Sequence, residues 1–275
     1  MTSVINITSA LLPPAYCGAV AIYALAFFKR ESGFQRWTRP ALILALTLHT
    51  VLIYAETVYF GHCLVYSPFE LMTLFAFTIA LTYLIVELAT GERGTGLFFL
   101  SLALIFQTLS NMFSPGAGAD TNPALLQNAV GLHISAAIFG YTAFAMSAVY
   151  GILYLMLYHQ IKSSHFGTLY NRLPSLGLLE KMSAYSAIIG LCFLSIAIVI
   201  AVTWLPDALP GFRYYDPKVI ATGGVWLLYA SAIGMKYFAR VGQRRFVLLS
   251  LVGFAGVFLS MTVVNILLSD FHDFQ

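Results

Sequence analysis

Two histidines of this 275-residue chain are candidate ligands for a metal. His133 stands at the start of one apolar run, and His272 follows the last such run. Neutral imidazole is a common axial ligand of haem iron, and two imidazoles make the iron six-coordinate. If the apolar runs cross a membrane in alternating directions, both histidines lie on the same face. The pair therefore predicts a haem site, although His272 taken alone could equally be a solvated residue of the chain end.

The segment GFRYYDPK, residues 211–218, carries side chains that suit a porphyrin. Tyr214 and Tyr215 could stack against a flat macrocycle, while Arg213 and Lys218 could pair with its propionates. An aromatic belt at the membrane interface, followed by an ordinary turn, would give the same pattern. Because the segment has two interpretations, its spacing alone does not decide between them.

A third histidine, His49, lies in the middle of the apolar run at 39–60. Ionisable groups at that depth in a membrane are rare and usually functional. Glu56 follows two helical turns later on the same face, so the pair could form a proton path, or His49 could bind a ligand. A neutral imidazole hydrogen-bonded to a neighbouring helix is an equally good interpretation. His62, in the loop that follows, is a weaker candidate for a metal ligand.

The composition places all these residues in a membrane protein. Hydrophobic residues make up 60% of the chain and charged residues only 9%, whereas soluble domains carry about 25% charged residues. A spanning helix needs about 20 apolar residues, and backbone groups in lipid must be satisfied within the segment. We therefore expect an all-α polytopic membrane protein that forms one transmembrane domain over residues 1–275. Its eight helices are expected at residues 9–28, 39–60, 69–89, 96–113, 132–158, 182–204, 219–239 and 246–268.

The distribution of basic residues predicts the orientation of these helices. Of the 14 Lys and Arg residues, all but Arg213 and Lys218 fall in the loops after the first, third, fifth and seventh runs. Cytoplasmic loops carry such an excess, so both termini are expected on the non-cytoplasmic side. No basic residue precedes the first run, which we therefore expect to be retained rather than cleaved as a signal peptide. The chain has no C-x-x-C-H motif, so any haem would be bound non-covalently.

Two stretches resemble a known family. HISAAIFGYTAFAMSAVYGILYLMLYHQ and LPSLGLLEKMSAYSAIIGLCFLSIAI resemble the core of the CcsA/CcmC-type cytochrome c assembly proteins, with closer similarity to their HemX and YpjD-like branch. DPKVIATGGVWLLYA resembles the segment after the family's tryptophan-rich haem-binding loop. The resemblance covers roughly residues 40–272. It implies haem handling at the outer face, with the family's two outer histidines at His133 and His272. It also implies an embedded histidine at His49, with His62 as an alternative alignment.

The chain departs from the family pattern at several positions. Asp216, Pro217 and Lys218 of the loop motif remain, but the tryptophan positions hold Leu209, Arg213 and Tyr215. A second embedded histidine is expected near Gly234, and none is there. These differences imply an incomplete apparatus for attaching haem to an apocytochrome, so we assign no catalytic residue and do not expect a synthetase.

Three functions follow from these patterns. We expect a protein of the bacterial inner (cytoplasmic) membrane that binds heme b non-covalently and acts in haem delivery, haem retention or cytochrome c biogenesis. Alternatively, resemblance to HemX implies a regulatory protein without haem turnover, which would contact a tetrapyrrole-pathway partner through the basic loop 159–181. A proton-coupled transporter using His49 and Glu56 is the weakest interpretation, because we find no inverted repeat. None of the three involves nucleic acid.

Overall fold

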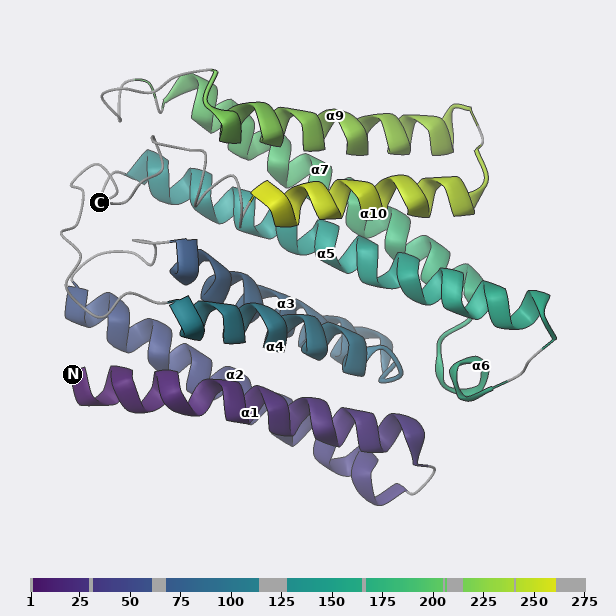
Figure 1. Ribbon diagram of the computed structural model, residues 1–275, viewed down its shortest axis with the longest axis horizontal. Helices are drawn as coiled ribbons and strands as arrows, with labels where there is room; N and C mark the ends of the chain where they lie inside the picture. The colour runs from purple at the N-terminus through teal and green to yellow at the C-terminus, as the bar shows by residue number, and fades with distance from the viewer. Residues whose placement is uncertain are drawn as a thin grey trace. The chain divides into compact units, whose positions relative to one another are not determined.

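The computed structural model of the chain describes residues 2–29, 32–60, 68–113, 128–164, 167–204, 206, 215–239 and 241–260. Every regular element within these ranges is helical, which confirms the all-α prediction. Figure 1 shows the helices α1 (Thr2–Phe28), α2 (Ser32–Phe60), α3 (Pro68–Thr90), α4 (Gly96–Phe113), α5 (Asn128–Lys162), α6 (Thr168–Arg172), α7 (Leu176–Thr203), α9 (Pro217–Tyr237) and α10 (Gln243–Leu259). The short α6 lies within the loop expected at 159–181 and was not predicted.

Six of the described helices are long and apolar enough to cross a membrane, which agrees with the membrane setting predicted from composition. These candidate spans are Thr2–Phe28, Gly33–Tyr59, Glu70–Thr90, Val130–Lys162, Leu176–Thr203 and Pro217–Tyr237. The apolar stretch of α4 is shorter, at Gly96–Met112. The eighth predicted crossing, 246–268, extends beyond the described residues. Eight crossings and the orientation of the termini therefore stay predictions.

The helices divide into two compact units. The N-terminal unit contains α1 to α4 together with α6, and the C-terminal unit contains α5, α7, α9 and α10. Each unit is described by itself below. The expectation of a single transmembrane domain stays a prediction.

In the N-terminal unit, α1 packs along α2 and α4 (Figure 1). Aromatic side chains fill its core: the rings of Phe75 and Phe106 meet edge to face at 4.6 Å, and those of Tyr83 and Phe99 stack at 5.4 Å. Helix α1 contains the pair Pro13–Pro14 in its interior. Each proline removes one backbone donor from the helical ladder, so two carbonyl groups one turn earlier lose their helical partners.

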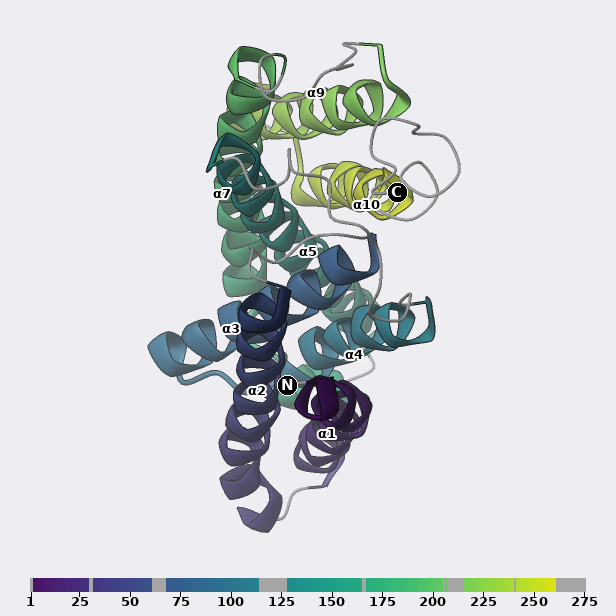
Figure 2. The same ribbon diagram turned by 90° about the vertical axis from the view of Figure 1, so that its left-hand side faces the viewer.

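In the C-terminal unit, α5 packs along α7, while α10 packs on both α5 and α9 (Figure 2). The rings of Phe144 and Tyr229 stack at 3.7 Å, joining α5 to α9. The Tyr229 hydroxyl donates to the carbonyl oxygen of Ser250 in α10 at 2.9 Å. Large buried aromatic pairs of this kind contribute beyond their area burial, so they fix how α5, α9 and α10 pack.

Small residues on α5 let its neighbours approach closely. The Ser147 hydroxyl lies 3.4 Å from the Ser183 hydroxyl of α7, and a Cβ on Gly151 would lie 2.9 Å from a methyl group of Val247. The four-residue spacing of Ala143, Ser147 and Gly151 in the sequence thus corresponds to a packing face. This face holds α5 in place, and α5 carries the first candidate ligand.

Candidate functional site

His133 lies in the second turn of α5 and is half-buried. Its Nδ1 atom is 2.9 Å from the carbonyl oxygen of Ala197 in α7. A carbonyl oxygen only accepts hydrogen bonds, so Nδ1 must carry the proton and donate it. The neutral ring then has its free lone pair on Nε2, the atom through which a histidine held in this way binds a metal. The α5–α7 packing therefore fixes the tautomer and the orientation of this imidazole.

The start of α9 lies in the same unit. Asp216 is buried and caps the helix, because its side-chain oxygen accepts a hydrogen bond from the Lys218 backbone N–H at 2.8 Å. Pro217 then occupies the first turn, where a missing N–H costs nothing. The Asp-Pro-Lys sequence is therefore a helix start, and the cap is one structural role of Asp216. Its predicted contact with a cofactor stays a prediction. Tyr215, just before it, is 73% exposed.

The structure brings Lys218 and His133 into one neighbourhood. The positive charge of Lys218 acts on the His133 imidazole. The Tyr141 hydroxyl of α5 lies 3.5 Å from the Thr222 hydroxyl of α9. Tyr141 is two turns after His133 and Thr222 is one turn after Lys218, so this contact links the same two helices. Four predicted site residues, His133, Tyr215, Asp216 and Lys218, thus belong to the described part of this unit. Arg213, Tyr214 and His272 lie outside the described residues, as does His62.

His49 lies in the N-terminal unit and is fully buried in α2. Its Nδ1 is 2.9 Å from the hydroxyl oxygen of Tyr16 in α1, and its ring meets the edge of Phe77 at 5.1 Å between centroids. The hydrogen bond to a neighbouring helix is therefore present, yet Nε2 has no hydrogen-bond partner among the described residues. Within the same part of the chain, no hydrogen bond links His49 to Glu56.

Closed metal sites need three or four protein ligands. Over the described ranges, no three His, Cys, Asp or Glu side chains gather in that way. Haem makes a smaller demand, because the porphyrin occupies four positions and the protein adds only axial ligands. Single imidazoles fit the second requirement and not the first. The Nε2 lone pair of His133 is free because Nδ1 donates to a carbonyl, whereas the Tyr16 hydroxyl can either donate to His49 Nδ1 or accept from it, so the tautomer of His49 is open.

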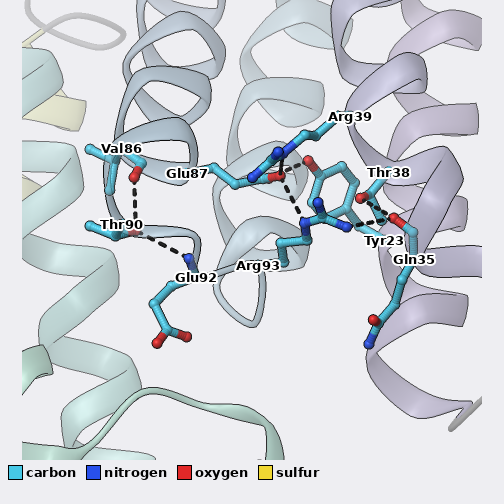
Figure 3. Close-up of polar contacts among 9 residues, drawn as sticks. All are labelled: Tyr23, Gln35, Thr38, Arg39, Val86, Glu87, Thr90, Glu92 and Arg93. Carbon is cyan, nitrogen blue, oxygen red and sulfur yellow. Dashed lines mark hydrogen bonds and ion pairs between the residues drawn. The ribbon is translucent and has the colours of Figure 1, made fainter. Parts of the chain in front are cut away.

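Sequence reasoning missed a buried acid in the N-terminal unit, Glu87 of α3 (Figure 3). Its carboxylate is wholly buried, accepts a hydrogen bond from the Tyr23 hydroxyl at 2.6 Å, and pairs with Arg39 at 2.8 Å. Arg93 also pairs with it, at 3.4 Å, and donates to the carbonyl oxygen of Gln35 at 2.8 Å. The cluster joins α1, α2 and the end of α3. An acid inside a predicted crossing was the available signal.

The chain is similar in sequence to proteins of two kinds, HemX and CcsA. The chain is 27% identical over 221 residues to "Protein HemX" of Bacillus subtilis (strain 168), which covers 78% of this chain and 80% of that protein. It is 26% identical over 224 residues to "Protein HemX" of Brevibacillus brevis, covering 81% and 82% of the two chains. It is also 23% identical over 301 residues to "Cytochrome c biogenesis protein CcsA" of Trieres chinensis, covering 98% and 96%. No solved structure gives a significant match.

A family model described as "Cytochrome C assembly protein" matches residues 65–272, well over half of the chain. This match, with relatives of both the HemX and CcsA types, confirms the resemblance inferred from the core segments. The chain therefore belongs to the cytochrome c assembly protein family.

Proposed function

We propose that this membrane protein handles haem for cytochrome c biogenesis and binds heme b non-covalently at the non-cytoplasmic face through His133 and His272. Membership of the cytochrome c assembly family supports a role in cytochrome c biogenesis. One observation carries the site: the hydrogen bond from His133 Nδ1 to the Ala197 carbonyl, at 2.9 Å, leaves Nε2 as the ligand atom. His272 would supply the second histidine ligand.

Side chains near the start of α9 would hold the rest of the cofactor. Tyr214 and Tyr215 are proposed to contact the macrocycle, and Arg213 and Lys218 to meet its propionates. The electrostatic proximity of Lys218 to His133 supports this role. Asp216 acts indirectly, because its helix cap orients the backbone that carries Lys218. When bound, haem supplies the iron and the redox chemistry, while these residues orient and retain it.

His49 is proposed as a separate, embedded ligand. The Tyr16 hydroxyl fixes its ring through Nδ1, and Nε2 has no partner among the described residues. In the proposed tautomer Nδ1 donates to the Tyr16 oxygen, which leaves the Nε2 lone pair to bind iron. A buried polar atom without a hydrogen bond costs free energy, so such atoms are rare in folded proteins. A bound ligand at Nε2 would account for this one.

We further propose eight crossings of a bacterial inner membrane, with both termini on the non-cytoplasmic side and the helices forming one transmembrane domain. The excess of basic residues in the loops after the first, third, fifth and seventh apolar runs supports this orientation. Alkaline phosphatase fused after Gln275 should be active, and the same enzyme fused after Ser163 should be inactive. The reverse pattern would overturn the topology.

The decisive experiment is an absorption spectrum of the full chain, purified in detergent and titrated with hemin before and after dithionite reduction. A saturable Soret band with sharp α and β bands is expected for low-spin bis-histidine haem. His133→Ala and His272→Ala should each lose this signature while the protein stays folded. His159→Ala is the matched control, because His159 is exposed near the other end of α5. Unchanged spectra in the folded His133→Ala/His272→Ala variant would overturn the ligand assignment.

A second function is a regulatory membrane protein that contacts a tetrapyrrole-pathway partner without haem turnover. It is favoured by the identities to the two HemX relatives, 27% and 26%, which exceed the 23% to the CcsA relative. The basic loop 159–181 would be the docking surface. A folded protein that takes up no hemin, yet loses its cellular effect when this loop is replaced, would establish this function instead.

A further inference from the structure

The N-terminal unit contains a pocket of about 340 Å³ that the haem proposal does not use. Helices α1, α2 and α6 and the turn after α3 contribute to its wall. Two arginines line it, Arg93 and Arg172, together with the polar residues Gln35 and Thr38. None of the described residues that line it is acidic. The pocket thus presents positive charge without a carboxylate of its own.

Both lining guanidinium groups are anchored by the main chain. Arg93 Nη1 donates to the carbonyl oxygen of Gln35 at 2.8 Å, and Arg172 Nη2 donates to that of Lys29 at 3.2 Å. A guanidinium group has five N–H donors, so each keeps donors for another acceptor. The main-chain hydrogen bonds already restrict these long side chains. Binding a ligand would therefore cost less side-chain conformational entropy.

The nearby acid does not neutralise the pocket. The Glu87 carboxylate already accepts from Tyr23 and pairs with Arg39 at 2.8 Å, so Arg93 meets it only as a third partner at 3.4 Å. Glu92, the next acid along the chain, is exposed and directs its carboxylate away from this cluster (Figure 3). Arg172 has no carboxylate partner among the described residues.

Close packing holds α6 against this pocket. A Cβ on Gly94 would collide with the backbone carbonyl of Arg172. Glycine at this position therefore lets the end of α6 approach the turn after α3 and brings Arg172 to the pocket.

We propose that this pocket is a binding site for a phosphate group, carried either by a soluble molecule or by an anionic phospholipid. Phosphate oxygens match the fork of a guanidinium group, and a doubly charged phosphate would balance the two lining arginines. Ala26 and Phe27 add an apolar wall for the part of the ligand beyond the phosphate. The site lies among the basic loops that the charge distribution predicts to be cytoplasmic. With that orientation, the ligand would come from the cytoplasm or the inner leaflet. The site is independent of the haem ligands.

Calorimetric titration of the full chain, in a detergent free of phospholipid, with pyrophosphate as the probe tests the proposal. Saturable binding is expected. Arg172→Gln should weaken pyrophosphate binding about tenfold or more, because the ligand loses a hydrogen bond from a charged group. Gly94→Ala should weaken it comparably without changing any charge, by displacing α6. Arg36→Gln is the matched control: it removes the same charge from an exposed residue of α2 that does not line the pocket.

A second arm identifies the source of the phosphate. The titration is repeated in nanodiscs of phosphatidylcholine with and without phosphatidylglycerol. Loss of pyrophosphate binding only when phosphatidylglycerol is present would assign the site to a lipid headgroup, and unchanged binding would assign it to a soluble phosphate. The proposal is overturned if folded protein shows neither saturable pyrophosphate binding nor retained phosphatidylglycerol. Equal losses in Arg172→Gln and Arg36→Gln would also overturn it.

Discussion

The Asn111 side chain of α4 donates a hydrogen bond to the Ser9 carbonyl oxygen of α1 at 2.7 Å. Ser9 lies four residues before Pro13, so its carbonyl would normally accept from a backbone N–H that proline lacks. The same amide also reaches the Ser9 hydroxyl at 3.2 Å. A side chain of α4 thus replaces a missing rung of α1 and ties the two helices together.

This relationship predicts a dependence between two substitutions. Asn111→Ala should lower the free energy of unfolding by about 1–3 kcal/mol, because the Ser9 carbonyl loses its donor inside a membrane helix. In a Pro13→Ala background the loss should be smaller, since the alanine restores a backbone N–H that can bond the Ser9 carbonyl. The measurement is a double-mutant cycle by thermal unfolding in detergent. Strictly additive effects would mean that the two residues act separately.

The close approach of α5 and α7 makes a second prediction. A Cβ on Gly190 would lie 2.5 Å from the ring of Phe144, which cannot move easily because it stacks on Tyr229. Gly190→Ala should therefore destabilise the protein by roughly 1–3 kcal/mol through overpacking. Gly177→Ala in the same helix is the control, since its Cβ would meet nothing within 4 Å. Thermal melts in which both variants behave alike would contradict the packing described here.

Glu87→Gln tests the buried ion cluster. The substitution removes the negative charge that pairs with Arg39 and Arg93. It also leaves one acceptor oxygen where the carboxylate uses two, one for Arg39 and one for the Tyr23 hydroxyl. We expect a loss of roughly 3 kcal/mol, the lower end for a broken buried pair, because the two arginines are one-third exposed and can turn to solvent. Glu92→Gln, at an exposed acid five residues later, should change stability little. The measurement is chemical unfolding of the two variants side by side. Equal denaturant midpoints would show that the Glu87 ion cluster does not stabilise the protein.

Asp216 separates helix capping from cofactor contact. Asp216→Ala should cost about 1 kcal/mol of stability by removing the cap on the Lys218 N–H, and Asp216→Ser should restore most of it. If hemin affinity follows stability across both variants, Asp216 acts through the helix start. A hemin affinity that stays low in the stable Asp216→Ser protein would instead show that the carboxylate itself is needed at the site.

Tyr16→Phe probes the embedded histidine. It keeps the ring but removes the hydroxyl that bonds His49 Nδ1. If His49 binds haem as proposed, losing this supporting hydrogen bond should weaken hemin binding roughly 10- to 100-fold. Tyr54→Phe provides the comparison, because Tyr54 is 67% exposed on the same helix as His49. Hemin titrations that do not distinguish the two variants would remove His49 from the ligand set.

Hydropathy was sufficient to predict an all-helical membrane protein, because each apolar run carries its own signal. A local motif was also present in the sequence: Asp216 followed by Pro217 is typical of a helix start, and α9 begins there. Contacts between distant residues could not be predicted in the same way. Arg39 and Glu87 are 48 residues apart, and only the folded chain reveals that they pair. The partners of His49 and His133 depended on helix packing for the same reason.

The acceptor that holds His133 belongs to the main chain of α7, not to a side chain. Any residue at position 197 supplies the same oxygen, provided that the helix keeps its course and the side chain fits the buried position of Ala197. The orientation of this imidazole is therefore insulated from sequence drift on α7 in a way that a carboxylate partner would not allow. Homologues could lose recognisable similarity along this helix and still present the histidine in the same tautomer.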